Sequence, residues 1–154
     1  MRRAALLALA AAILVSSGAE AGSASELFNA AQSGDTREVA RQIARGVSVN
    51  AALRNGGTAL MIAASMGHVE VARQLIARGA LVNAVTTTGD TALSLAAANG
   101  HMEMARLLLI HGADPDYRTA AGVTPMTLAA EQGHTDVVEL LMRVSIESDR
   151  DRDF

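Results

Sequence analysis

The sequence has no cysteine, no tryptophan and no lysine, and its 154 residues include only three aromatics, Phe28, Tyr117 and Phe154. The absence of cysteine excludes disulfides, zinc–thiolate sites, covalent haem attachment, a lipid-modified cysteine and a cysteine nucleophile. With so few aromatics, a hydrophobic core must be built from Ala, Leu, Val, Ile and Met. The length favours one domain, because domains usually run to ~100–200 residues.

All 13 basic residues are arginine, and the formal net charge is −3. Without the segment 1–21, which holds Arg2, Arg3 and Glu20, the charge is −4. Nucleic-acid-binding proteins usually carry a basic stripe, and the sequence shows none. Half of the residues are hydrophobic, but many of these lie within the segment 1–21. The remainder therefore has the composition of an ordinary globular protein.

The segment 1–21 has the pattern of a secretory signal peptide. A basic start precedes an unbroken apolar stretch, 4–15, and a stretch of small residues that ends in Ala19-Glu20-Ala21. This order predicts cleavage after Ala21, with Ala19 as the alternative. A helix over 4–15 is ~18 Å long, too short for a hydrocarbon core ~30 Å thick. We therefore expect export and no membrane attachment after cleavage. The Lys-free, Ala- and Arg-rich composition suggests a bacterial gene, which favours the periplasm.

The rest of the chain repeats itself at one fixed interval, equal to the distance in sequence between Gly34 and Gly67. Repetition at such an interval is the signature of a stacked array of structural units. Four copies of this unit fill the segment 22–154, so we expect no further domain. Alanine pairs, threonines and glycines recur at this interval. The recurring positions are Ala30-Ala31, Ala63-Ala64, Ala96-Ala97 and Ala129-Ala130; Thr58, Thr91 and Thr124; Gly34, Gly67, Gly100 and Gly133; and Gly46, Gly79 and Gly112.

Each copy predicts two short helices and a loop. The first helix begins at a threonine N-cap and, in the third copy, runs from Thr91 to Asn99. Pro125 takes the first helical position in the fourth copy, and a glycine ends each first helix in the left-handed conformation. The second helices are expected at 69–78, 102–111 and 135–143, and each ends before a loop of about a dozen residues. The paired alanines allow neighbouring helices to approach closely.

The third copy shows the full pattern in Gly89-x-Thr91-Ala92-Leu93, Ala96-Ala97, Gly100-His101-x-Glu103, Leu107-Leu108-Leu109 and Gly112-Ala113-Asp114. This pattern resembles the ankyrin repeat over about residues 25–144. The resemblance implies an all-α solenoid of about four helix–turn–helix repeats with projecting hairpin loops. The expected divisions are a signal peptide (1–21), an N-terminal capping repeat (22–54), two inner repeats (55–87 and 88–120), a C-terminal capping repeat (121–146) and a charged tail (147–154).

The departures from the family pattern are informative. The fourth place of the family motif Thr-Pro-Leu-His holds no histidine here, so the histidine's hydrogen bond to its own loop must be absent or replaced. Asp35 stands in the first copy where the later copies have histidine, and Ser145 in the fourth where a helix-ending glycine belongs. Both changes are typical of terminal caps, for which we expect a polar outer face. The residues at the fourth place are Phe28, Met61, Ser94 and Thr127.

Histidine and methionine raise the question of a metal site. His68, His101 and His134 are spaced by one repeat, an offset of ~8–10 Å, whereas zinc ligands lie ~2.0–2.1 Å from the ion. These imidazoles are therefore expected to bond backbone and dock neighbouring loops, and His111 to lie on the surface. Met102 and Met104 form a Met-x-Met that copper would accept, but the matched residues are mostly apolar, so core packing is the better interpretation. For Met61 and Met66, the sequence leaves both core packing and copper binding open.

No catalytic constellation is visible. Glu70 with Arg73, and Glu103 with Arg106, have the i,i+3 spacing of a solvated helix face. Motifs of serine hydrolases, P-loops, zinc proteases and dinucleotide-binding folds are absent. The charged tail 147–154 is expected to fray, with docking of the tail as the alternative. We therefore expect no enzyme, no cofactor and no metal.

Variation at matched positions marks the candidate binding surface. In ankyrin proteins, the resemblance implies that hairpin tips and the inner helix face bind other proteins. Ile62, Leu95 and Leu128 are expected to pack instead. The candidate residues at the tips are Arg54, Asn55, Thr87, Thr88, Ala120 and Ala121, and those at the ends of the first helices are Met66, Asn99, Glu131 and Gln132.

These features predict a monomeric, non-enzymatic protein-binding module in the periplasm that acts on one partner protein. Among exported bacterial ankyrin proteins, the resemblance suggests a role beside a partner enzyme, including a catalase in oxidative-stress defence. The alternative is an immunity-type or inhibitor protein that binds a toxin or a hydrolase. A metal-binding protein is the remote alternative. The scarcity of aromatic anchors favours a modest, polar interface.

Overall fold

The computed structural model describes residues 21–152, so the predicted signal peptide and its cleavage alternative at Ala19 lie outside the described residues, apart from Ala21. Within this range the chain forms eight α-helices and, besides them, one isolated β-bridge. The helices are α2 (Ala21–Ser33), α3 (Thr36–Ala44), α4 (Ala59–Met66), α5 (Val69–Ala77), α6 (Ala92–Ala98), α7 (Met102–Ile110), α8 (Pro125–Glu131) and α9 (Thr135–Arg152).

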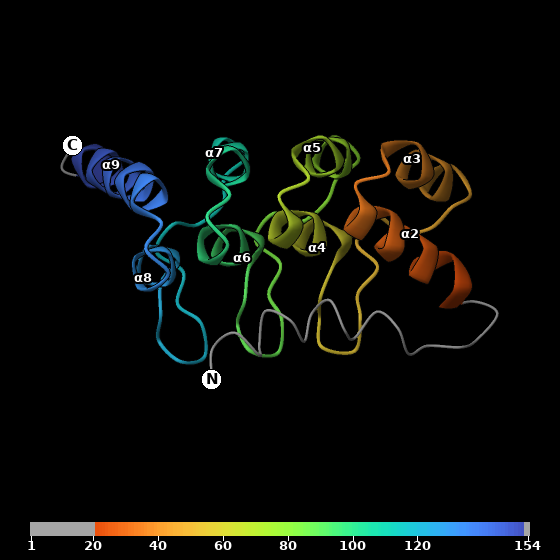
Figure 1. The fold of residues 1–154 in the computed structure, drawn as a ribbon, viewed down its shortest axis with the longest axis horizontal. Coiled ribbons are helices and arrows are strands. Elements are labelled where there is room, and N and C mark those ends of the chain that lie inside the picture. The colour runs from red at the N-terminus through yellow and green to blue at the C-terminus, as the bar shows by residue number, and fades with distance from the viewer. Residues whose placement is uncertain (1–20, 153–154) are drawn as a thin grey trace.

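The helices form two rows, and each pair contributes one helix to each row. Figure 1 shows α2, α4, α6 and α8 in one row, α3, α5, α7 and α9 in the other, and three loops that project away from both. Each helix packs against its pair mate and against the equivalent helix of the next pair. This confirms the all-α solenoid predicted from the sequence.

The threonine N-caps lie where the sequence places them. Thr58, Thr91 and Thr124 have extended backbone, and each hydroxyl accepts the backbone N–H three residues on. Ser94 makes the reciprocal hydrogen bond, since its Oγ accepts the N–H of Thr91 at 2.8 Å. The N-cap threonines thus satisfy donors that a helix N-terminus leaves unpaired. Asp35 caps α3 in the same way through its carboxylate.

The alanine pairs form the contact between neighbouring first helices. Ala63 and Ala64 in α4, and Ala96 and Ala97 in α6, are fully buried. Small side chains at these positions let the backbones of α4 and α6 approach closely, as expected. The second row is filled by leucines one repeat apart, namely Leu75, Leu108 and Leu141.

The first repeat closes its end of the stack with polar groups. Gln42 takes the place of these leucines and is fully buried. Its Nε2 donates to Glu26 Oε2 and Glu38 Oε1, both at 2.6 Å. Arg41 and Arg45 pair with these carboxylates from the surface. The first repeat thus holds a bonded polar side chain at the buried place that leucines fill in the later repeats.

The fourth repeat differs from the expected cap. Ala130 is exposed although its equivalent Ala97 is fully buried, and Met142 and Ile146 are 49% and 54% exposed. The prediction of a polar outer face is wrong here, since the apolar surface that docks a following repeat is retained. Helix α9 also runs to Arg152 instead of ending at 143, so the tail continues the helix through its described residues. Ser145, in place of glycine, supplies no stop for the helix.

Asparagines tie successive loops together along the stack. Asn50 Nδ2 donates to Gly79 O at 3.1 Å, and its Oδ1 accepts the N–H of Leu81 at 2.9 Å. Asn83 makes the same two bonds one repeat on, to Gly112 O at 2.8 Å and from the N–H of Asp114 at 2.9 Å. At the next step an aspartate, Asp116, accepts one bond, from Ser145 Oγ at 3.5 Å. This asparagine ladder therefore weakens at the fourth repeat.

Candidate functional site

The three projecting loops are hairpins whose tips are joined to one another. Within a hairpin, Thr86 N donates to Asp90 O at 3.0 Å, and Leu53 and Thr119 make the equivalent bonds. Between hairpins, Thr87 N donates to Asn55 O at 2.9 Å and Ala120 N donates to Thr88 O at 3.0 Å. The tips thus form a continuous ribbon of paired backbone beside the first-helix row.

The junction between the second and third tips requires glycine. Gly89 has φ +80°, a left-handed conformation that other residues rarely adopt. A Cβ atom at this position would lie 2.7 Å from the backbone nitrogen of Ala120. The same left-handed conformation at Gly122 meets no neighbour, since a Cβ there would have nothing within 4 Å. Gly89 therefore sets how closely these two tips approach.

A groove of about 280 Å³ lies between these two tips and the helices α6 and α8. Its base is apolar and its rim is polar. The lining residues are Thr88, Asp90, Ser94, Leu95, Ala98, Thr119, Ala120, Ala121, Val123, Leu128, Glu131 and Gln132. The groove therefore joins tip residues and helix-end residues that the sequence marked as candidates.

Small side chains in α6 make room for this groove. Ser94 and Ala98 line it, whereas the matched residues in α4 are Met61 and Ser65. Met61 is 1% exposed and fills its place in the core. Ser94 instead folds back on its own helix, where it bonds Thr91 N and O. The change from methionine to serine at this matched position is thus one of the differences between the two junctions.

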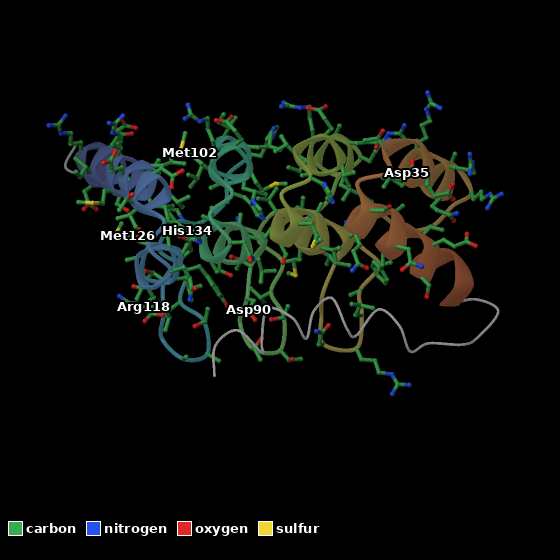
Figure 2. The ribbon with its side chains drawn as sticks, in the orientation of Figure 1. Asp35, Asp90, Met102, Arg118, Met126 and His134 are labelled. Atoms are coloured by element: carbon green, nitrogen blue, oxygen red, sulfur yellow. The ribbon has the colours of Figure 1, made fainter. Side chains whose placement is uncertain are left out.

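The groove carries two acidic residues and no basic one among its lining residues. Asp90 is held by threonine hydroxyls, since Oδ2 accepts from Thr88 Oγ1 at 2.5 Å and from Thr86 Oγ1 at 3.4 Å. Glu131 lies at the exposed C-terminal end of α8. Arg118, on the last hairpin, donates to Gly122 O at 3.1 Å and does not line the groove. Figure 2 shows Asp90 on the loop side of the helix rows and Arg118 on the last loop.

The structure gathers half of the candidate residues and leaves the others apart. Thr88, Ala120, Ala121, Glu131 and Gln132 line the groove. The remaining five do not line it.

Of these, Asn99 has a structural role, because its Nδ2 donates to Leu95 O at 2.8 Å. Asn55 is also structural, since its Oδ1 accepts the N–H of Gly57 at 3.0 Å. Arg54, Thr87 and Met66 are exposed. No side-chain hydrogen bond or ion pair within residues 21–152 explains their identity.

Several groove residues were not among the candidates. The clearest signal for them in the sequence is the drop in side-chain volume from Met61 to Ser94 at one matched place. Leu128 was expected only to pack, and it is partly buried while lining the groove. The other lining residues missed by the sequence are Asp90, Leu95, Ala98, Thr119 and Val123.

The histidines dock one repeat onto the preceding one, as predicted. His68 Nε2 bonds Gln32 O and His101 Nε2 bonds Ser65 O, each at 2.9 Å. Each imidazole also covers the helix-ending glycine of the previous repeat, since a Cβ at Gly67 would lie 2.7 Å from His101 Nδ1. His134 occupies the same position against Gly100. The imidazoles therefore act as spacers between repeats.

The methionines and the helix-face acids also have structural places. Met104 is fully buried, Met102 packs against the core, and Met66 is 43% exposed. Within residues 21–152, no three His, Asp or Glu side chains gather in a way that could hold a metal ion. On the exposed side of the second-helix row, Glu70 pairs with Arg73 at 3.5 Å and Glu103 with Arg106 at 3.9 Å, as predicted.

The structure is a repeat solenoid. Its helix pairs repeat, its hairpin tips are joined by backbone hydrogen bonds, and a groove lies on the loop side as a candidate binding surface. Comparison with protein-family models agrees: "Ankyrin repeats (3 copies)" matches residues 27–119 and "Ankyrin repeat" matches 121–151. The chain belongs to the ankyrin-repeat family, whose repeats form protein–protein interaction modules. No curated protein matches the sequence. None of the helices within 21–152 has the length and apolar character to cross a membrane.

Proposed function

We propose that the chain is exported to the periplasm, where it binds one partner protein without catalysing a reaction and so regulates or supports that partner. The observation that carries this proposal is the groove between the second and third hairpin tips. It collects five of the ten candidate residues that vary between copies, on a scaffold whose other positions repeat. Such a combination is typical of a constant frame that presents a variable contact surface.

An enzyme of oxidative-stress defence such as a catalase is our proposed partner, following the resemblance to exported ankyrin proteins. Binding at the loop side leaves the solvated face of α5 and α7 outside the interface. The monomer is the proposed binding unit, since the groove is built from one chain.

Site-specific photocrosslinking in the producing cells tests the binding. A photoreactive amino acid replaces Ala121 at the groove rim, and in a matched control it replaces Ile110, an exposed residue on α7. We expect one protein to be crosslinked from position 121 and not from 110, and mass spectrometry to identify it. Equal crosslinking from both positions, or none from 121, contradicts a partner-binding groove.

The export signal has a separate test. Residues 1–21 are fused to β-lactamase, which protects cells from ampicillin only when it reaches the periplasm. We expect resistance from this fusion and none after Leu9→Arg, because a charge in the apolar segment blocks export. Resistance that survives the substitution, or none from the original fusion, contradicts the proposed localisation.

A further inference from the structure

The groove between α6, α8 and the last two tips has a chemistry that specifies its occupant. Its base consists of Leu95, Ala98, Val123 and Leu128, which offer aliphatic contacts, and the hydroxyl of Ser94 beside them is already bonded to Thr91 N and O. An apolar group that enters this base leaves water and gains van der Waals contacts. A polar or charged group there would lose hydration without a side-chain partner. The base therefore selects an aliphatic side chain.

The size of the groove limits what can enter. Its volume of about 280 Å³ lies just below the ~300–1,000 Å³ of typical small-molecule sites. One or two side chains of a protein segment fit this space. The backbone of the tips offers the partner few hydrogen bonds, because Ala120 N already donates to Thr88 O. Recognition thus depends on side chains, not on an added β-strand.

The rim adds a charge requirement. Asp90 and Glu131 reach the groove from different elements, one from a hairpin and one from α8, and no basic side chain lines the groove. The two threonine hydroxyls that bond Asp90 both use Oδ2, which fixes the carboxylate in place. A fixed carboxylate attracts a cation at lower entropic cost than a mobile one, and an anion there would be repelled.

We infer that the groove binds a partner segment in which an aliphatic residue stands next to an arginine or lysine. The aliphatic side chain enters the base, and the cationic group pairs with Asp90 and Glu131 at the rim. This inference rests on the proposed function, that the chain binds a protein, and it adds the chemistry of the bound segment.

Selection from a phage library of random short peptides, on the immobilised purified protein, tests this chemistry. Expected are peptides enriched in Arg or Lys beside Val, Leu, Ile or Met. Peptides without such enrichment, or enriched in Asp and Glu, overturn the inference. If they do so while photocrosslinking from position 121 still captures one partner, the proposed function stands and only the groove chemistry fails.

Substitutions then locate the bound peptide. Ser94→Met copies the residue that fills the preceding junction, and Ala121→Arg places a cation on the exposed rim without touching the core. We expect the dissociation constant of a selected synthetic peptide, measured by calorimetry, to rise at least about tenfold with each. Binding that neither variant weakens overturns the assignment to the groove.

The charge contribution has a matched control. Asp90→Asn with Glu131→Gln removes both rim carboxylates, and Glu70→Gln with Glu103→Gln removes two carboxylates from the far helix face. The first pair should weaken peptide binding about tenfold, and raised salt should weaken wild-type binding in the same direction. The second pair should leave it unchanged. Equal effects of the two pairs would show only general attraction by an acidic protein and would overturn the rim pairing.

Discussion

The second–third and the third–fourth repeat junctions share one scaffold and differ in what fills it. Both have a threonine N-cap, a buried alanine and a histidine over a glycine. At the first junction Met61 fills the space under the tips, whereas at the second Ser94 leaves a groove. The comparison teaches that the repeating positions hold the array together, while matched positions that differ, Met61 against Ser94 among them, shape the surface at each junction.

Met61→Ser removes this difference between the two junctions and has the largest expected effect. Loss of a buried methionine side chain costs ~2–5 kcal/mol, and the new hydroxyl can bond Thr58 as Ser94 bonds Thr91. We expect the free energy of unfolding, from urea titration, to fall by about 3–4 kcal/mol. Met66→Ser, at the exposed methionine of the same helix, should change it by less than about 0.5 kcal/mol. Equal losses would mean that Met61 does not fill the junction.

Gly89→Ala acts on the tip junction beside the groove. The left-handed backbone costs a non-glycine residue ~1–2 kcal/mol, and the added Cβ would also press on Ala120 N. We expect a loss of about 2–3 kcal/mol. In Gly122→Ala the added Cβ meets open space, so the free energy of unfolding should fall only by the cost of the left-handed backbone. If the two variants unfold at the same urea concentration, the tips are not held as closely as the structure shows.

Asn83→Asp tests the asparagine ladder. The aspartate cannot donate to Gly112 O, so one hydrogen bond is lost and a carbonyl is left to solvent. A net hydrogen bond contributes ~0.5–1.5 kcal/mol, so we expect a loss of about 1 kcal/mol by thermal or urea unfolding. Asp116→Asn, where the ladder ends, should change stability by less than about 0.5 kcal/mol. A larger loss of stability from the substitution at Asp116 than from the one at Asn83 would contradict the conclusion that the ladder is weaker at the third–fourth junction than at the second–third junction.

Glu103→Gln should have the smallest effect. Its pair with Arg106 is 3.9 Å long and both side chains are at least half exposed, and such surface pairs contribute ~0–1 kcal/mol. We expect a change below about 0.5 kcal/mol, with peptide binding unaltered. A larger loss of stability would show that the Glu103–Arg106 pair contributes more than an ordinary exposed ion pair.

The sequence predicts the helix pairs well, because threonine caps and helix-ending glycines recur at a fixed interval. Local chemistry at Thr91 or Gly100 is enough to set a boundary. It does not predict the length of α9, since Ser145 and the residues after it permit a helix without requiring one. The groove was only half predicted, because a cavity depends on how Ser94 and Leu128 from different repeats meet, and periodicity carries no information on the space left between them.

The weakened ladder step at Asp116 has a consequence for dynamics. The fourth repeat is held to the third by fewer specific bonds than the third is to the second, so we expect α8 and α9 to open locally more readily than the inner repeats. The groove lies at that same boundary. Any occupant bridges the two repeats, so it raises the free energy of local opening by an amount that grows with the ratio of its free concentration to its dissociation constant. Amide hydrogen exchange in α8 and α9 should therefore slow in proportion to occupancy, while exchange in α4 and α5 stays constant.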